Sequence, residues 1–137
     1  MIAYIDTSAL AKCYIREPRS LEVLEWAERH KGAATAVLTL VEFRCMLARR
    51  RRAAEIDGAL ERSALAQFDS HVRNDAWRIH QISFGDYAEA RDLIETLPEL
   101  PLRTLDALHL AAARRINATE FASSDGTQLK AARALGF

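Results

Sequence analysis

Short apolar segments recur along this chain, and each is followed by polar or acidic residues. The first is Ile2–Ile5, which precedes Asp6 and two hydroxyl residues, Thr7 and Ser8. Runs of this length between polar residues are typical of buried β-strands. We expect four strands, at Ile2–Ile5, Ala34–Leu38, Ile79–Ile82 and Thr119–Ser124.

Between these segments, apolar residues recur every three or four positions, which is the period of an α-helix. Leu21, Leu24 and Ala27 show this spacing in one stretch, which Pro18 and Gly32 bound on either side. The predicted helices are Ser8–Ile15, Arg19–His30, Thr39–Ala53, Ala59–Trp77, Phe84–Leu97, Thr104–Ile116 and Asp125–Leu135.

Strands and helices therefore alternate, and no tight hairpin signal joins one strand to the next. This order is typical of parallel strands connected by helical crossovers. We expect an α/β fold, a three-layer α/β/α sandwich around a central, mainly parallel sheet of four or five short strands. Because no repeat or linker divides the chain, residues 1–137 are predicted to form a single domain.

Composition limits the classes of protein to which this chain can belong. Half of the residues are hydrophobic, but no apolar run approaches the roughly 20 residues of a membrane span, and no signal-peptide pattern is present. We therefore expect a cytoplasmic protein with no membrane attachment. Cys13 and Cys45 lie beside apolar neighbours in helical patterns and are predicted to be reduced packing residues.

The charge pattern argues against a general nucleic-acid binder. The formal net charge is zero, with 19 basic and 19 acidic residues, whereas a general binder carries a basic excess. The basic residues are nevertheless 16 Arg and 3 Lys, and arginine suits bidentate contact with phosphate or carboxylate. The overall balance therefore leaves room for local charged sites.

Four acidic residues occupy equivalent places in the predicted pattern. Asp6 directly follows the first strand, and Asp125 directly follows the last. Glu42 lies one turn into the helix after the second strand, and Asp106 lies in the first turn of the helix that begins at Thr104. Because the carboxyl ends of parallel strands meet at one edge of a sheet, we expect these four acids at one rim.

Each acid also has a purely structural interpretation. Asp6 and Asp125 could cap the helices that follow them, and Thr39 with Glu42 matches a capping box. Asp106 could complement a helix dipole. Capping alone does not require all four acids to share one rim, where their mutual repulsion is unfavourable. A bound cation would remove that conflict.

The donor types indicate which cation this would be. Carboxylates with nearby hydroxyls and no cysteine are the oxygen ligands that suit Mg²⁺, with Mn²⁺ as a substitute, rather than zinc. Such an ion polarises a phosphoryl oxygen and activates water. The residues therefore favour phosphodiester hydrolysis.

At this point the sequence resembles a known family. The segments YIDTSALAK, LTLVEF, TLDALHLAAA and FASSDGTQLKAA resemble, in order and spacing, the motifs of PIN-domain ribonucleases, particularly the VapC toxins of bacterial toxin–antitoxin pairs. The resemblance extends from Ile2 to Gly136. It implies a PIN-like fold, a Mg²⁺-dependent endoribonuclease and an RNA substrate. It also implies a homodimer, and a small antitoxin protein that covers a groove near the active site, often with an arginine presented to the carboxylates.

The resemblance also implies roles for individual residues. The residues that match the family's catalytic acids are Asp6, Glu42, Asp106 and Asp125. The expected metal ligands among them are Asp6, Asp106 and Asp125. Thr7 or Ser8 is in position to support the first acid or a metal-bound water. A second acid often follows the last one in the family, whereas Gly126–Gln128 follow here, so Asp125 either binds the ion directly or acts through water.

Other conspicuous residues are predicted to have structural roles. His109 lies three residues after Asp106 on the same helix face and is predicted to be a polar residue at the edge of the core, although it could bind a carboxylate or a phosphate. Arg49–Arg52 is predicted to be mainly a solvated helix end that complements the dipole, with a subset able to follow an RNA backbone. The aromatic residues expected in core or dimer contacts are Trp26, Phe43, Phe68 and Trp77.

Two other functions remain open at the sequence level. The first is a PIN-like module that binds RNA or protein without cutting it. The second, less favoured, is a phospho-accepting receiver domain, which needs an acidic pair after the first strand and a lysine after a late strand. Asp6 stands alone, and Lys12, Lys31 and Lys130 are not in such a place.

Overall fold

A four-stranded parallel sheet forms the centre of the molecule in the computed structural model, which describes residues 1–137. The strands are β1 (Ala3–Ile5), β2 (Ala33–Ala36), β3 (Trp77–His80) and β4 (Glu120–Ala122). Their spatial order is β3-β2-β1-β4, and every neighbouring pair is parallel. The predicted parallel sheet is therefore confirmed, with four strands.

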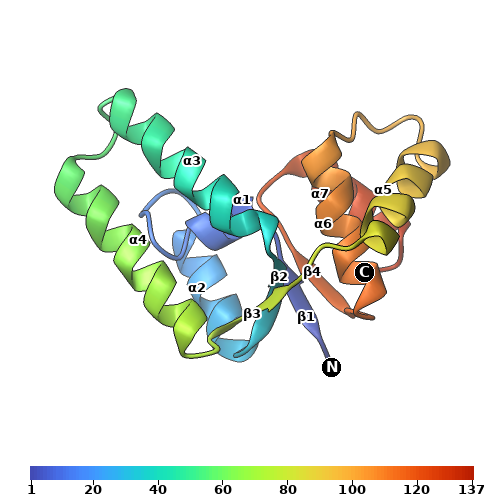
Figure 1. Ribbon diagram of the computed structural model, residues 1–137, viewed down its shortest axis with the longest axis horizontal. Coiled ribbons are helices and arrows are strands. Elements are labelled where there is room, and N and C mark those ends of the chain that lie inside the picture. Colours follow the sequence, from blue (N-terminus) through green and yellow to red (C-terminus); the bar gives the residue numbers. More distant parts are fainter.

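Helices cover both faces of the sheet and complete the predicted three-layer α/β/α sandwich (Figure 1). The helices of one layer are α1 (Thr7–Ala11), α2 (Ser20–Arg29), α3 (Leu38–Arg52) and α4 (Gly58–Arg73). Those of the other layer are α5 (Phe84–Thr96), α6 (Thr104–Arg115) and α7 (Gly126–Ala134).

The alternation of side chains along β1 divides the core between these layers, because successive residues of a strand point to opposite faces. Ile5 packs with the α1–α4 layer, in a cluster that includes Phe43 and Phe68. Tyr4 points to the other face and packs with Ala112 of α6. The prediction that Phe43 and Phe68 belong to the core is confirmed, since both are buried.

The boundaries of two early elements differ from prediction. The helix expected over Ser8–Ile15 is the shorter α1, after which the chain continues in tight turns closed by the bonds from Cys13 N–H to Leu10 O and from Tyr14 N–H to Ala11 O. The strand expected to reach Leu38 ends at Ala36, because Val37 already has helical backbone angles.

The predicted helix Ala59–Trp77 is also too long. The helix α4 ends at Arg73. Two residues later, Asp75 adopts a left-handed conformation with φ of 58°, which a continuing helix could not include. Trp77 then opens β3 and pairs with Ala33 in the sheet. The strand ends at His80, so Ile82, which the prediction included, lies outside it.

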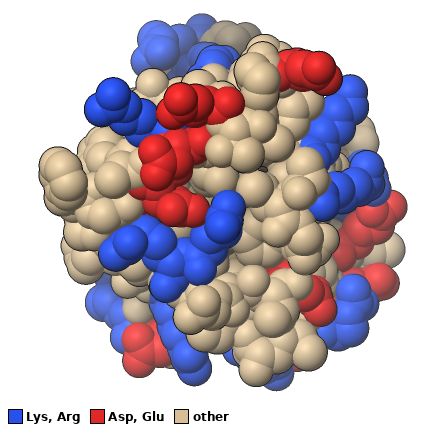
Figure 2. Space-filling model, turned by 90° about the vertical axis from the view of Figure 1, so that its right-hand side faces the viewer, with Lys and Arg blue, Asp and Glu red and all other residues tan.

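The surface of the α5–α7 layer carries charges of both signs side by side (Figure 2). Two ion pairs on this layer join α6 to α5, Arg114 with Glu89 at 3.2 Å and Arg115 with Asp86 at 3.4 Å. Among the helices, none combines the length and the apolar character that crossing a membrane requires.

Candidate active site

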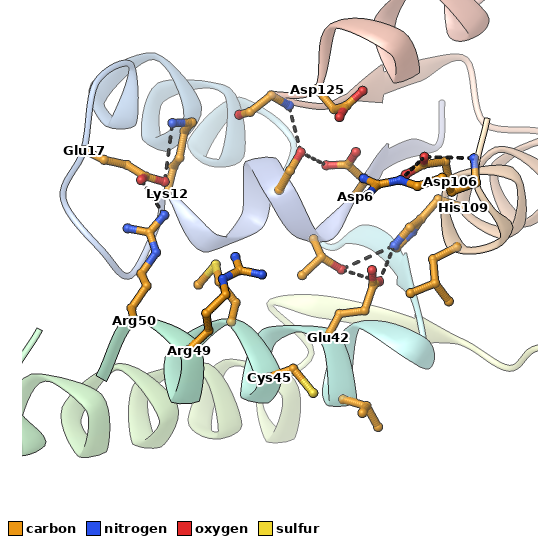
Figure 3. Close-up of a pocket in the computed structure, with 17 residues that line it drawn as sticks. Asp6, Lys12, Glu17, Glu42, Cys45, Arg49, Arg50, Asp106, His109 and Asp125 are labelled. Carbon is orange, nitrogen blue, oxygen red and sulfur yellow. Dashed lines mark hydrogen bonds and ion pairs between the residues drawn. The ribbon is translucent and has the colours of Figure 1, made fainter. Parts of the chain in front are cut away.

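A cavity of about 590 Å³ opens at the carboxyl edge of the sheet, where ligands gather in parallel α/β folds. Its walls come from segments far apart in the sequence, among them the β1–α1 junction, α3 and the start of α6 (Figure 3). All six predicted site residues line it, and these are Asp6, Thr7, Ser8, Glu42, Asp106 and Asp125.

Asp6 is buried at the point where β1 passes into α1. Its Oδ1 accepts hydrogen bonds from the Ala9 backbone N–H at 3.0 Å and from Ser8 Oγ at 2.7 Å, and its Oδ2 accepts from Ser123 Oγ at 2.5 Å. Burial raises the pKa of Asp6, and neither the nearby His109 nor these hydrogen bonds cancel that effect. The aspartate therefore caps α1 while it lies in the cavity wall, so the capping interpretation is confirmed and its metal-binding role stays a prediction.

Ser123 connects Asp6 to the last acid. Its hydroxyl donates to Asp6 and accepts the backbone N–H of Asp125 at 3.0 Å. Asp125 in turn caps α7 by accepting the Gln128 N–H at 2.9 Å. None of the three residues that follow Asp125 in place of a second acid, Gly126–Gln128, lines the cavity, and Gln128 is buried.

Asp106 projects from the first turn of α6 and is half-buried. It accepts the backbone N–H of Arg103 at 3.2 Å, and the Arg103 guanidinium lies 3.5 Å away. Its predicted role at the helix N-terminus and its place in the cavity are thus compatible.

Glu42 has a different environment, and the capping box predicted for Thr39 and Glu42 is wrong. The helix begins one residue earlier, at Leu38, and Thr39 is buried beneath the site with its hydroxyl 2.9 Å from those of Thr7 and Thr35. Thr7 Oγ1 donates to Glu42 Oε1 at 2.8 Å. Because each hydroxyl has one proton, donation by Thr7 requires Thr39 to donate to Thr7 and Thr35 to donate to Thr39.

A second chain of hydrogen bonds reaches the same oxygen through His109. His109 Nε2 lies 2.7 Å from Glu42 Oε1, and its Nδ1 lies 2.7 Å from the Tyr4 hydroxyl. An ionised carboxylate can only accept, so Nε2 carries a proton, and a neutral His109 accepts the Tyr4 proton at Nδ1. The two chains occupy Glu42 Oε1 and leave Oε2 without a protein partner.

His109 and Ser123 are the residues whose contribution the sequence did not reveal. His109 is buried as a core residue would be, but it also binds a carboxylate, which was the alternative noted for it. Its position three residues after Asp106 is the available signal. Ser123 could have been found from its place at the end of β4, two residues before Asp125.

Cys45 also differs from prediction. It is exposed and lines the cavity, whereas Cys13 is partly buried and packs against the core. Both cysteines are free thiols. The packing role is therefore correct for Cys13 and wrong for Cys45.

The donor set suits a hard cation such as Mg²⁺, since it consists of carboxylates and hydroxyls. As the side chains stand, no three His, Cys, Asp or Glu residues are close enough to hold one ion together. Magnesium commonly binds through one or two carboxylates and keeps several waters, which this cavity has room for. A shared ion at Asp6, Asp106 and Asp125 remains a prediction.

Comparison with known proteins adds independent information. The family model described as the PIN domain matches residues 3–134. The chain is 34% identical to Ribonuclease VapC47 of Mycobacterium tuberculosis (strain CDC 1551 / Oshkosh), an alignment that covers 98% of this chain and 92% of the relative.

A solved structure shares the fold. The crystal structure of VapC20 of Mycobacterium tuberculosis, described as a toxin that cleaves the sarcin–ricin loop, superposes with a TM-score of 0.74. It covers 98% of this chain and 95% of its own, at 20% sequence identity.

Proposed function

The chain belongs to the PIN-domain family, and from this premise we propose that it is a Mg²⁺-dependent endoribonuclease that acts as the toxin of a toxin–antitoxin pair. The observation that carries the proposal is the meeting of Asp6, Glu42, Asp106 and Asp125 in one cavity at the carboxyl edge of the sheet. The similarity to a ribonuclease over nearly the whole chain supports the same reaction.

Each acid has a distinct part in this proposal. Asp6, Asp106 and Asp125 hold the ion, directly or through water. Mg²⁺, with Mn²⁺ as a substitute, supplies polarisation of the phosphoryl oxygen and a more acidic water. Ser8 and Ser123 fix the carboxylate of Asp6 by hydrogen bonds.

Glu42 acts on the proton of the attacking water. Its Oε1 is held by Thr7 and His109, and its Oε2 is the atom free to accept a proton in the cavity. A general base needs such an unpaired, well-oriented atom. Cleavage then forms a bond between the water oxygen and phosphorus and breaks the P–O bond to a ribose oxygen of the strand, which leaves as a hydroxyl after taking up a proton from solvent.

The partners follow from the same premise. We propose an RNA substrate, a small antitoxin that covers the cavity, and a homodimer that works in the cytoplasm. The carboxylates that attract a metal ion would equally attract a cationic side chain of an antitoxin, which supports inhibition by occupation of the site.

Cleavage of a structured RNA tests the proposal. We expect cutting with Mg²⁺, none with EDTA, and a loss of at least about 100-fold for Asp106→Asn, since a metal-held phosphoryl transfer depends on its carboxylates. Asp92→Asn is the matched control, because Asp92 is exposed and lies outside the cavity. Equal cutting in all samples would identify a contaminant and contradict the proposal.

Growth separates the toxin from a non-catalytic PIN-like module. Induced expression of the wild-type chain is expected to arrest growth, and Asp6→Ala is expected to abolish the arrest. A chain that neither cuts RNA nor binds Mg²⁺ at millimolar concentration would instead be a binding module.

A further inference from the structure

The cavity that holds the acids is divided by charge. The four predicted site acids lie at one end, where Arg103 pairs with Asp106. Lys12, Glu17 and Arg50 lie at the other end, with Arg49 between the two ends (Figure 3). A cavity with a metal-binding end and a cationic end suits a ligand that carries more than one negative charge along its length.

Four cations line the cavity, and three of them already have protein partners, since Arg103 pairs with Asp106. Arg50 donates to Glu17 at 2.7 Å, and Lys12 lies 3.4 Å from Glu17 and donates to the Pro18 carbonyl at 2.9 Å. Burial alone would raise the pKa of Glu17, but the hydrogen bond and charge of Arg50 and the charge of Lys12 outweigh it and lower the pKa. Lys12 and Arg50 are therefore held in place by a carboxylate that offsets part of their charge.

Arg49 has no such partner. It lines the cavity and is exposed, and its guanidinium makes no hydrogen bond and no ion pair with any protein group. A guanidinium in this state keeps its charge and all its N–H donors available, and its planar geometry matches two oxygens of a phosphate.

The position of Arg49 relative to Glu42 is fixed by α3. The two residues are seven positions apart on one helix, so they face the same side at a separation of roughly 10 Å along the axis. Cys45 and Met46 line the cavity between them.

We infer that Arg49 binds a backbone phosphate of the RNA close to the phosphate that is cut, so that the strand runs along α3 from the acids toward Arg50. The inference rests on the proposed ribonuclease function. It assigns to one member of the Arg49–Arg52 run a positioning task, while Arg51 and Arg52 lie outside the cavity.

The test compares Arg49→Gln with Arg51→Gln. The control removes the same charge from the same run, two positions along, where the side chain does not line the cavity. Binding of a labelled single-stranded RNA is measured in EDTA, so that no cutting occurs. We expect Arg49→Gln to weaken binding by about tenfold, as loss of a charge-assisted contact does, and Arg51→Gln to weaken it much less. The slope of log K against log salt should fall by about 0.7 for Arg49→Gln.

A neutral methylphosphonate placed at one phosphate at a time locates the contact. In the wild-type protein, one position near the mapped cut should lower affinity, and Arg49→Gln should be insensitive to the change at that position. Equal weakening by Arg49→Gln and Arg51→Gln, or unchanged sensitivity at every phosphate, would overturn the inference. Absence of cutting by the wild-type protein with Mg²⁺ would instead count against the proposed function, because the binding measurement needs no catalysis.

Discussion

At the scale of single residues, the most informative feature is the way Glu42 is held. Its Oε1 is the end point of two buried hydrogen-bond chains, one through Thr7 and one through His109. Tyr4, at the start of the second chain, is fully buried in the central strand. The carboxylate is thereby anchored through buried groups to β1, and only Oε2 has no protein partner.

Replacement of His109 tests whether this anchoring matters for catalysis. We expect His109→Leu to reduce kcat by about 100-fold, because a misplaced catalytic group loses that much, and to lower the free energy of unfolding by about 1–3 kcal/mol, since Tyr4 and Glu42 each lose a buried partner. Single-turnover cleavage and urea unfolding measure the two effects.

His109→Gln separates positioning from packing. A glutamine amide can donate to Glu42 and accept from Tyr4, so part of kcat should return. Equal kcat for the leucine and glutamine variants would contradict a positioning role for His109.

The acids and their supporting residues differ in how far the sequence reveals them. Asp6 and Asp125 follow strands directly, so the strand pattern alone predicts that they meet at one edge. The contact between His109 and Tyr4 joins residues 105 positions apart and depends on how α6 packs against β1. The residues around His109 in the sequence do not indicate such a contact. The sequence alone therefore predicts His109 to be an ordinary polar residue near the core.

At the scale of elements, Asp86 connects α5, β3 and α6 through its side-chain contacts. Its side chain is fully buried and accepts the Ser83 backbone N–H at 2.8 Å, where α5 begins. It also pairs with His80 of β3 at 3.0 Å and with Arg115 of α6 at 3.4 Å. Asp86 thus fixes the α5–α6 pair to the edge of the sheet, away from the cavity.

Removal of Asp86 should therefore destabilise the fold without a direct effect on the site. We expect Asp86→Ala to cost about 1–3 kcal/mol of unfolding free energy, because the Ser83 N–H and hydroxyl lose a buried acceptor. Asp92→Ala, an exposed change on the same helix, should cost less than about 0.5 kcal/mol. Urea unfolding at pH 7 checks both, and equal stability of the two variants would contradict this role.

The same residue predicts a pH dependence. Burial alone would raise the pKa of Asp86, but the hydrogen bonds from Ser83 and His80 outweigh it and lower the pKa. A lowered pKa in the folded state means that the stabilisation is present above the ordinary value of about 3.9 and is lost as the pH falls through the lowered value. The stability difference between wild type and Asp86→Asn should therefore shrink as the pH falls below about 4.

Element boundaries were harder to predict than elements. The apolar period continues from α4 through Trp77 and obscured the turn signal of Asn74 and Asp75, although Asn and Asp adopt positive φ more readily than other non-glycine residues. The end of β2 was not predicted either, because valine is a residue typical of strands, whereas Val37 adopts helical backbone angles in the structure. Periodicity reports which side of an element is buried, but tertiary packing decides where the element stops.

At the scale of the whole molecule, a net charge of zero conceals a concentration of negative charge at one edge of the sheet. Burial raises the pKa of Tyr4, and the charges of Asp6 and Glu42 raise it further. The alternation of strands and helices predicted that these acids share one edge, because the carboxyl ends of parallel strands always lie on the same side of a sheet. The neighbour order β3-β2-β1-β4 needed the folded structure, since the pattern along the chain does not state which strands pair.

This concentration of charge leads to a prediction for the protein without RNA. A ligand that binds only the folded state raises the free energy of unfolding by about 2.7 kcal/mol when its concentration is 100 times its Kd. If Mg²⁺ binds in this way, the Tm should rise by several degrees as MgCl₂ is added and then level off. Burial raises the pKa of Asp6, and the Asp6→Asn variant removes this unfavourable buried charge. The Tm of the variant without metal should therefore equal or exceed that of wild type, and its Tm should rise less with Mg²⁺. Potassium chloride of equal ionic strength is the control, because salt screens repulsion without occupying a site. An equal rise with both salts would show that repulsion is screened but no ion is bound, and a large loss of Tm in Asp6→Asn without metal would assign Asp6 to capping α1 alone.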